Sequence, residues 1–100
     1  MSKKTGQIKE LLKREGIESQ GWPNCGEDAR QVVRALGGKI VSFDDPHGKI
    51  GYQNGETVIY TNHHVVAELP SGVVVDLGNP KQVFTNMEEY KQKGIKIKEK

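Results

Sequence analysis

The sequence predicts an α+β fold in which helices from the N-terminal part pack on a small antiparallel sheet. The first third of the chain contains two segments with apolar residues at helical spacing. After Lys39 the pattern changes to short apolar runs separated by Gly, Pro, Asn and Asp, which is typical of strands joined by tight turns. Because 100 residues is the length of one domain, we expect residues 1–100 to form a single domain.

The composition argues against several classes of protein. Hydrophobic residues make up 34% of the chain and lie in clusters, which indicates a folded core rather than disorder. The formal net charge of +2 is too small to indicate a nucleic-acid partner, and no apolar stretch is long enough to span a membrane. The N-terminal residues lack an apolar signal-peptide core, so we expect no signal peptide. A single cysteine cannot form an internal disulfide, which favours a reducing compartment.

The first helix is expected between Thr5, which is suited to cap it, and Gly16, which would end it. Apolar residues at i, i+3 and i+4 would face the core: Ile8, Leu11 and Leu12. Residues 17–23 then form a connector that ends in a Gly-Trp-Pro sequence.

The second helix is expected to begin at Cys25. Asn24 and Glu27 have the spacing of a capping box, in which each side chain accepts a hydrogen bond from the backbone of the other. Four apolar residues share the helix face of Cys25, at Ala29, Val32, Val33 and Leu36. Two consecutive glycines, residues 37–38, would end the helix.

The rest of the chain reads as an antiparallel meander with one late helix. Strands are expected at 40–43 and 50–53, with a turn at 44–48, and Asn54-Gly55 predicts a hairpin into one long strand over 56–69. A Pro-Ser-Gly turn at 70–72 leads into a strand at 73–77. Thr85 and Glu88 predict a second capping box before a helix at 86–93, and 95–97 forms a last edge strand.

Three positions in this order have the properties that thiol catalysis requires, namely a thiol, an imidazole that takes its proton and a group that orients the imidazole. Cys25 would lie at a helix N-terminus, where free N–H groups stabilise a thiolate. His63 and His64 lie in the long strand, and Asp76 lies at the end of the next one. The turn at 70–72 makes these strands antiparallel neighbours, and a staggered or bulged register would bring Asp76 to a histidine.

These segments resemble a family. Asn24-Cys25-Gly26, opening an apolar helix, is similar to the nucleophile helix of papain-like peptidases, transglutaminases and double-glycine leader peptidases. The stretch from His64 through the turn to Asp76 is similar to the histidine strand, turn and aspartate strand of transglutaminase-like and papain-fold enzymes. The resemblance covers about residues 20–80, and the whole chain looks most like the papain-fold toxin domains at the C-termini of bacterial polymorphic and contact-dependent toxins.

The resemblance implies a papain-like fold and a cysteine hydrolase or acyltransferase, either a protease or a deamidase. Cys25 would be the nucleophile, His64 the general base and acid, and Asp76 the residue that orients His64. Gln20, five residues before Cys25, is a candidate for the oxyanion hole. The implied partners are a protein substrate and a cognate immunity protein, with no cofactor. The site of action would be the cytoplasm, after delivery as part of a larger secreted protein.

Two alternatives concern the histidine and the chemistry. His64 is preferred because Val66 and Glu68 then match the positions that follow the catalytic histidine in transglutaminase-like strands. His63 has the more apolar face, with Val65, Ala67 and Leu69. Paired histidines also invite comparison with metal-dependent nucleases. Those sites need a histidine that leads into a metal-binding helix, whereas here residues 65–69 continue as strand, so we expect no metal.

A third class remains open, a non-catalytic binding or immunity-type module in which Cys25 is structural. The reactivity of the thiol separates it from the enzyme, because an ordinary buried thiol reacts only near its usual titration range.

Overall fold

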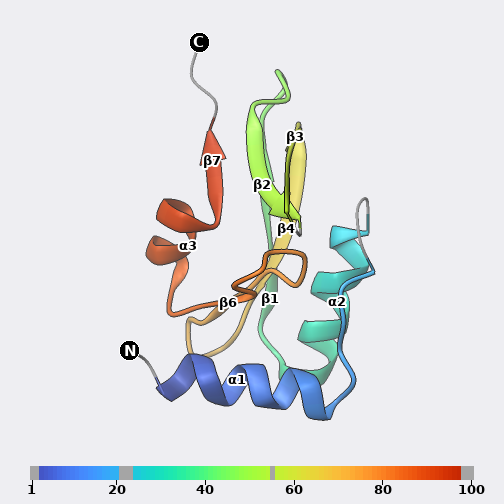
Figure 1. The fold of residues 1–100 in the computed structure, drawn as a ribbon, viewed down its shortest axis with the longest axis vertical. Coiled ribbons are helices and arrows are strands. Elements are labelled where there is room, and N and C mark those ends of the chain that lie inside the picture. The colour runs from blue at the N-terminus through green and yellow to red at the C-terminus, as the bar shows by residue number, and fades with distance from the viewer. Residues whose placement is uncertain (1–2, 21–23, 55, 98–100) are drawn as a thin grey trace.

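A computed structural model describes residues 3–20, 24–54 and 56–97 (Figure 1). The helices are α1 (Lys3–Arg14), α2 (Cys25–Leu36) and α3 (Met87–Lys93). The strands are β1 (Lys39–Asp44), β2 (Ile50–Asn54), β3 (Thr57–Thr61), β4 (His63–Glu68), β5 (Val74–Val75), β6 (Val83–Phe84) and β7 (Ile95–Ile97). The predicted α+β class is confirmed, with antiparallel pairing throughout these strands.

The strands form two small sheets rather than one meander. The first sheet has the order β1-β4-β5-β6, and the second has the order β3-β2-β7. The expected β2–β3 hairpin forms and is nested between β1 and β4, although Gly55 at its turn lies outside the described residues. The prediction of one long strand over 56–69 is wrong, because this segment forms two strands, β3 and β4. The chain breaks at Asn62, whose carbonyl accepts a hydrogen bond from Asp45 N (2.9 Å), so β3 pairs with β2 while β4 pairs with β1.

The first helix begins two residues before its predicted cap. Thr5 lies inside α1, because the lysines that precede it are good helix formers and nothing interrupts the helix there. The end is as predicted. Gly16 has a φ of 68°, and Ile17 N donates to Leu12 O (2.9 Å), which satisfies one of the last carbonyls.

The second helix begins at Cys25, as predicted, but without the predicted capping box. The Asn24 side chain makes no cap hydrogen bond and instead donates to Gln20 O (3.3 Å). Glu27 forms an exposed ion pair with Arg30. The connector is described as far as Gln20, and its Gly-Trp-Pro end at 21–23 lies outside the described residues.

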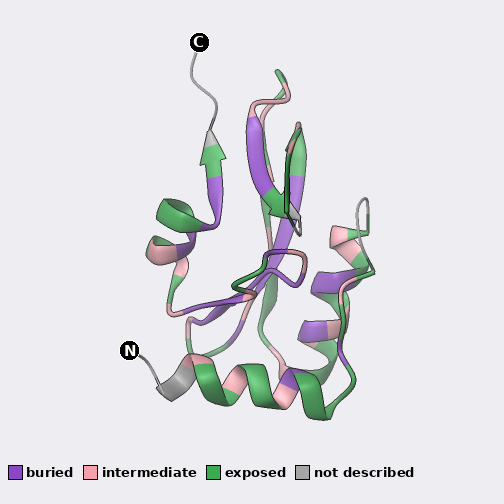
Figure 2. Cartoon of the chain, in the orientation of Figure 1, coloured by how far each residue is buried: buried purple, intermediate pink, exposed green. Residues whose placement is uncertain are grey.

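Two hydrophobic clusters lie on opposite faces of the first sheet, one toward α2 and one toward α3 (Figures 1 and 2). Alternate residues of β4 divide between them. Val65 and Ala67 join the α2-side cluster, and Val66 joins the α3-side cluster. The α2-side cluster comprises Leu12, Ile17, Ala29, Val32, Val65, Ala67, Leu69, Val73, Val75, Leu77 and Val83. The α3-side cluster comprises Ile50, Val66, Val74, Phe84, Tyr90 and Ile95.

The C-terminal third differs from expectation in its details. The strand predicted over 73–77 is reduced to β5, because residues 76–82 turn back and allow β6, which was not expected, to pair with it. The cap of α3 lies one residue later than predicted. Asn86 accepts from Glu89 N (2.8 Å), and the Glu89 carboxylate accepts from Thr85 N (2.9 Å). The edge strand at 95–97 is confirmed as β7, which pairs with β2. Among the described residues, none of the helices combines the length and apolar character needed to cross a bilayer.

Candidate functional site

The side chains of His64 and Asp76 meet inside the protein. His64 Nε2 lies 3.1 Å from Asp76 Oδ2, and the two residues are only 1% and 5% exposed. The strand register explains the contact without a stagger or a bulge. Because Ala67 pairs with Val75, continuing the register would set Asp76 opposite Val66, which makes His64 its diagonal neighbour on the same face. The predicted histidine–aspartate contact is therefore present, with His64 as its histidine.

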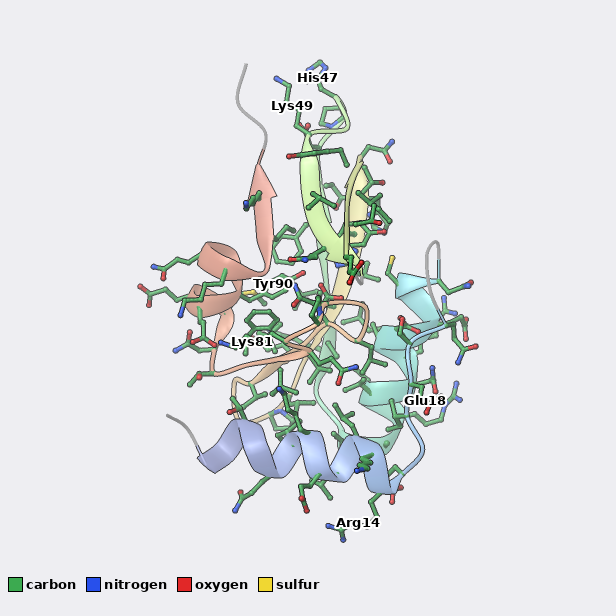
Figure 3. All side chains as sticks on the ribbon, viewed as in Figure 1. Arg14, Glu18, His47, Lys49, Lys81 and Tyr90 are labelled. Carbon is green, nitrogen blue, oxygen red and sulfur yellow. The ribbon has the colours of Figure 1, made fainter. Side chains whose placement is uncertain are left out.

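Tyr90 is a third member of this buried cluster, and sequence analysis missed it. Its hydroxyl donates a hydrogen bond to Asp76 Oδ2 (2.7 Å), the same oxygen that His64 approaches. Figure 3 shows the Tyr90 side chain pointing from α3 into the protein. Burial, and then the charge of Asp76, raise the pKa of Tyr90 far above its usual value, so the hydroxyl stays protonated.

The Tyr52 ring stacks on one face of the His64 ring. The two rings stack with centroids 3.7 Å apart and planes 14° apart. His64 Nδ1 is buried and has no hydrogen-bond partner among the described residues. If Nε2 carries the proton and donates it to Asp76, Nδ1 is left with its lone pair free to accept one.

Cys25 lies at the N-terminus of α2, half-buried against the α2-side cluster. Electrostatic effects link this end of α2 to the buried cluster. The charge of a Cys25 thiolate is among the lesser causes that raise the pKa of Tyr90. The carboxyl of Asp28, one turn further along α2, responds to the charges of both Asp76 and His64.

Cys25 and His64 nevertheless approach from different faces of the first sheet. His64 shares its face of β4 with Val66 and stacks on Tyr52, whereas Cys25 packs with the α2-side cluster. Since His64 Nδ1 has no partner among the described residues, no hydrogen bond joins it to the Cys25 sulfur. β5 pairs with β4 only at residues 67–68 in the described register, and beyond that pairing the Asp76 side chain contacts His64.

The alternative histidine lies outside the buried cluster. His63 is about half exposed, and its Nδ1 pairs with the Asp44 carboxylate on β1. Its backbone N–H is held by Thr61 Oγ1 at the break between β3 and β4. Through its contact with Asp44, His63 joins β4 to β1, which gives it a structural role.

Gln20 lies on another side of α2. Its backbone N–H donates to Asp28 Oδ1 (2.8 Å), and its side chain is exposed and reaches Glu18 O at 3.5 Å. The side chain lines a shallow hollow of about 340 Å³ together with Asn24, Glu27 and Gln31. The hydrogen bonds described for Gln20 do not connect it to Cys25.

Asp28 fixes the connector that precedes Cys25, a role that sequence analysis did not detect. Its carboxylate is 5% exposed and accepts from Ser19 Oγ (2.9 Å) as well as from Gln20 N. Gln31 Nε2 adds a hydrogen bond to Glu18 O (3.2 Å). Burial raises the pKa of Asp28, and the two hydrogen bonds on its carboxylate oppose that rise. An acidic residue in the first turn of a helix is so common that it carries no sequence signal for burial.

Over the described ranges, no three His, Cys, Asp or Glu side chains come together in a way that could hold a metal ion. His47 lies at the tip of the β1–β2 loop, far from Tyr90 (Figure 3). The chain was also compared with known proteins. No protein-family model, no curated protein sequence and no solved structure matches it.

Proposed function

We propose that the protein is a cysteine hydrolase or acyltransferase in which Cys25 is the nucleophile, His64 the general base and acid, and Asp76 the residue that orients His64. One observation carries the proposal. His64 is buried with Nε2 on a carboxylate and Nδ1 without a partner among the described residues. An unpartnered buried nitrogen is costly to a fold, so it indicates a functional role.

The proposed reaction is acyl transfer through a thioester. The Cys25 thiol gives its proton to His64 Nδ1, and the sulfur attacks the carbonyl carbon of an amide. The carbon–nitrogen bond then breaks, the leaving amine takes the proton from His64, and the acyl group stays on sulfur. Water attacks the thioester and gives a proton to His64, which returns it to the departing sulfur. An amine in place of water forms a new amide.

The start of α2 supports this chemistry. The first N–H groups of a helix have no carbonyl partner within the helix, so they are available to a thiolate or to a developing oxyanion. Gly26 follows Cys25, and a Cβ placed on it would meet no atom of the described residues within 4 Å. The described residues therefore leave room next to the Cys25 backbone for a substrate carbonyl. In this scheme backbone N–H groups of α2, rather than Gln20, stabilise the oxyanion.

The substrate and biological setting are further parts of the proposal. The amide is that of a protein, as a peptide bond or a glutamine side chain, and the resemblance to papain-fold toxin domains supports an intracellular toxin with an immunity protein that covers Cys25. Expression of the chain in a bacterial cytoplasm tests this part. Growth arrest that is absent with Cys25→Ala is expected, and equal growth of the two strains would count against a toxin that acts through this thiol.

The reactivity of Cys25 tests the enzyme itself. An ordinary thiol titrates near pH ~8.5, so it alkylates slowly at pH 6. We expect iodoacetamide to react rapidly with folded protein at pH 6, and His64→Ala, but not His63→Ala, to abolish this reaction. Alkylation that rises only near the ordinary range, in all three proteins, would contradict the proposal.

One observation favours a non-catalytic module as the second candidate. No hydrogen bond joins His64 Nδ1 to Cys25, and the sulfur packs against the α2-side cluster. In that case Cys25→Ala would behave as a small core truncation, and its stability loss would be its only effect. Slow alkylation at pH 6 together with such a stability loss would favour this module.

A further inference from the structure

We propose that Tyr90 is a positioning residue, whose hydroxyl holds the Asp76 carboxylate in place and thereby sets the protonation behaviour of His64. The importance of this role for catalysis rests on the proposed function. The inference is carried by one arrangement, in which the Tyr90 hydroxyl and the His64 ring approach the same carboxylate oxygen. Tyr90 Oη lies 2.7 Å and His64 Nε2 lies 3.1 Å from Asp76 Oδ2.

The chemistry of the three groups assigns the protons. Tyr90 is fully buried and its raised pKa keeps the phenol protonated, so it acts as a donor to the carboxylate. Asp76 Oδ2 is thereby kept as an acceptor. The neutral His64 ring must then place its proton on Nε2, which leaves Nδ1 as the basic nitrogen. A neutral donor on the carboxylate also disperses its charge, and so weakens its attraction for a protonated His64.

Packing fixes the Tyr90 hydroxyl where this chemistry needs it. The ring makes an edge contact with Phe84 at 5.0 Å and a tilted contact with Phe43 at 5.7 Å between centroids. A Cβ on Gly94 would lie 2.3 Å from Tyr90 Cδ1, so a side chain there would displace the ring. Gly94 has an ordinary helical φ of −97°, which means that space rather than backbone strain favours glycine. Residues from β1, β6 and the end of α3 therefore hold one phenol.

The other charged and titratable groups around His64 come from several elements. Asp76 bonds to it, Tyr52 stacks on it, and Asp28 responds to its charge. The charge of a Cys25 thiolate is a lesser cause of the raised pKa of Tyr90, and the adjacent His63 pairs with Asp44. Replacing Tyr90 by Phe leaves all of these in place and removes a single donor.

The test is an NMR pH titration of the His64 ring in protein labelled with ¹⁵N-histidine. In Tyr90→Phe we expect the titration midpoint of His64 to move upward by about 1 pH unit, since a carboxylate that loses a donor attracts the imidazolium more strongly. A midpoint that is unchanged or lower would overturn the inference.

Two further proteins separate the hydroxyl from the packing. Phe84→Leu removes one of the ring contacts and keeps the hydroxyl, so its His64 midpoint should move by clearly less than that of Tyr90→Phe. Site-specific 3-fluorotyrosine at position 90 keeps the ring and makes a stronger donor, so the midpoint should move downward even if Tyr90→Phe fails to fold. A shift in Phe84→Leu equal to that in Tyr90→Phe would assign the effect to packing and reject the inference.

Alkylation of Cys25 in the same proteins distinguishes this inference from the proposed function. A wild type that is inert at pH 6, combined with the expected His64 shifts, rejects the enzyme and keeps the role of Tyr90 on His64. A reactive wild type whose His64 midpoint and alkylation profile are unaffected by Tyr90→Phe keeps the enzyme and rejects the role of Tyr90.

Discussion

The ring of Tyr52 on β2 stacks on the ring of His64 on β4, with 3.7 Å between centroids. These strands belong to different sheets, so the stacked pair is a direct link between the second sheet and the first. His64 is thus held on one side by an aromatic ring and at Nε2 by a carboxylate. Its orientation depends on both sheets being in place.

Removing the Tyr52 ring should weaken the fold and loosen His64. Tyr52 is 4% exposed, so Tyr52→Ala is expected to lower the free energy of unfolding by about 3–5 kcal/mol, the usual range for a buried aromatic residue. Tyr52→Phe keeps the stacked ring and should lose at most about 1.5 kcal/mol. Urea unfolding measures both. Equal losses in the two variants would mean that the ring itself contributes little.

Asp76 should be the most sensitive polar position in the protein. Asp76→Ala leaves two buried donors, on His64 and Tyr90, without their acceptor, and should lower the free energy of unfolding by about 2–5 kcal/mol. Asp76→Asn retains one carbonyl oxygen as an acceptor and should lose less. Chemical denaturation of the two variants at neutral pH gives the comparison. An alanine variant as stable as the wild type would contradict the buried network.

The buried carboxyl of Asp28 should make stability depend on pH. Its folded-state pKa is raised above the unfolded value, so the folded protein binds this proton more tightly. The contribution of Asp28 to stability is then greatest below pH 3.8, the unfolded value, and falls as the pH rises through the raised folded value. Relative to Asp28→Asn, the wild type should lose stability over that window, as followed by urea midpoints at each pH. A difference that does not change with pH would contradict this environment for Asp28.

Two glycines with similar φ angles, Gly38 and Gly72, offer a matched test of close packing. A Cβ on Gly38 would lie 2.1 Å from Glu68 O, whereas a Cβ on Gly72 would meet no described atom within 4 Å. Both have left-handed φ values, 98° and 94°, so both alanine variants carry the strain of about 1 kcal/mol. Gly38→Ala adds a clash with backbone and should lose at least about 2 kcal/mol more. Thermal unfolding of the two variants would contradict this if their midpoints fell equally.

Local patterns were sufficient to predict much of the fold. The start of α2 at Cys25, the end of α1 at Gly16 and the Pro-Ser-Gly turn at 70–72 each depend on a few neighbouring residues. The same turn reverses the chain and so places Asp76 beside the strand that bears the histidines. The resulting His64–Asp76 contact follows from strand pairing, which is short-range in sequence here.

What the sequence could not show depends on long-range packing. Asn62 is poorly suited to a strand, but a single such residue does not predict a break, which is imposed by β1 and β2 pairing with different halves of the run. Tyr90 stands as the lone aromatic residue in a short polar helix, which predicts burial of the ring. Its hydroxyl partner, Asp76, is fourteen residues earlier and could not be identified without the fold.

The nested β2–β3 hairpin has a consequence for the order of folding. The His63–Asp44 contact closes β1 on β4 across a sequence separation of 19, which carries a considerable loop-closure entropy for a free chain. Once the local hairpin has formed, only short connections remain flexible between these strands, and that entropy falls. We therefore expect β2 and β3 to pair first and β1 and β4 to pair afterwards. The His64–Asp76–Tyr90 network, which draws on β4, the 76–82 turn and α3, would then be among the last interactions to assemble, so an intact network would mark a chain that has finished folding.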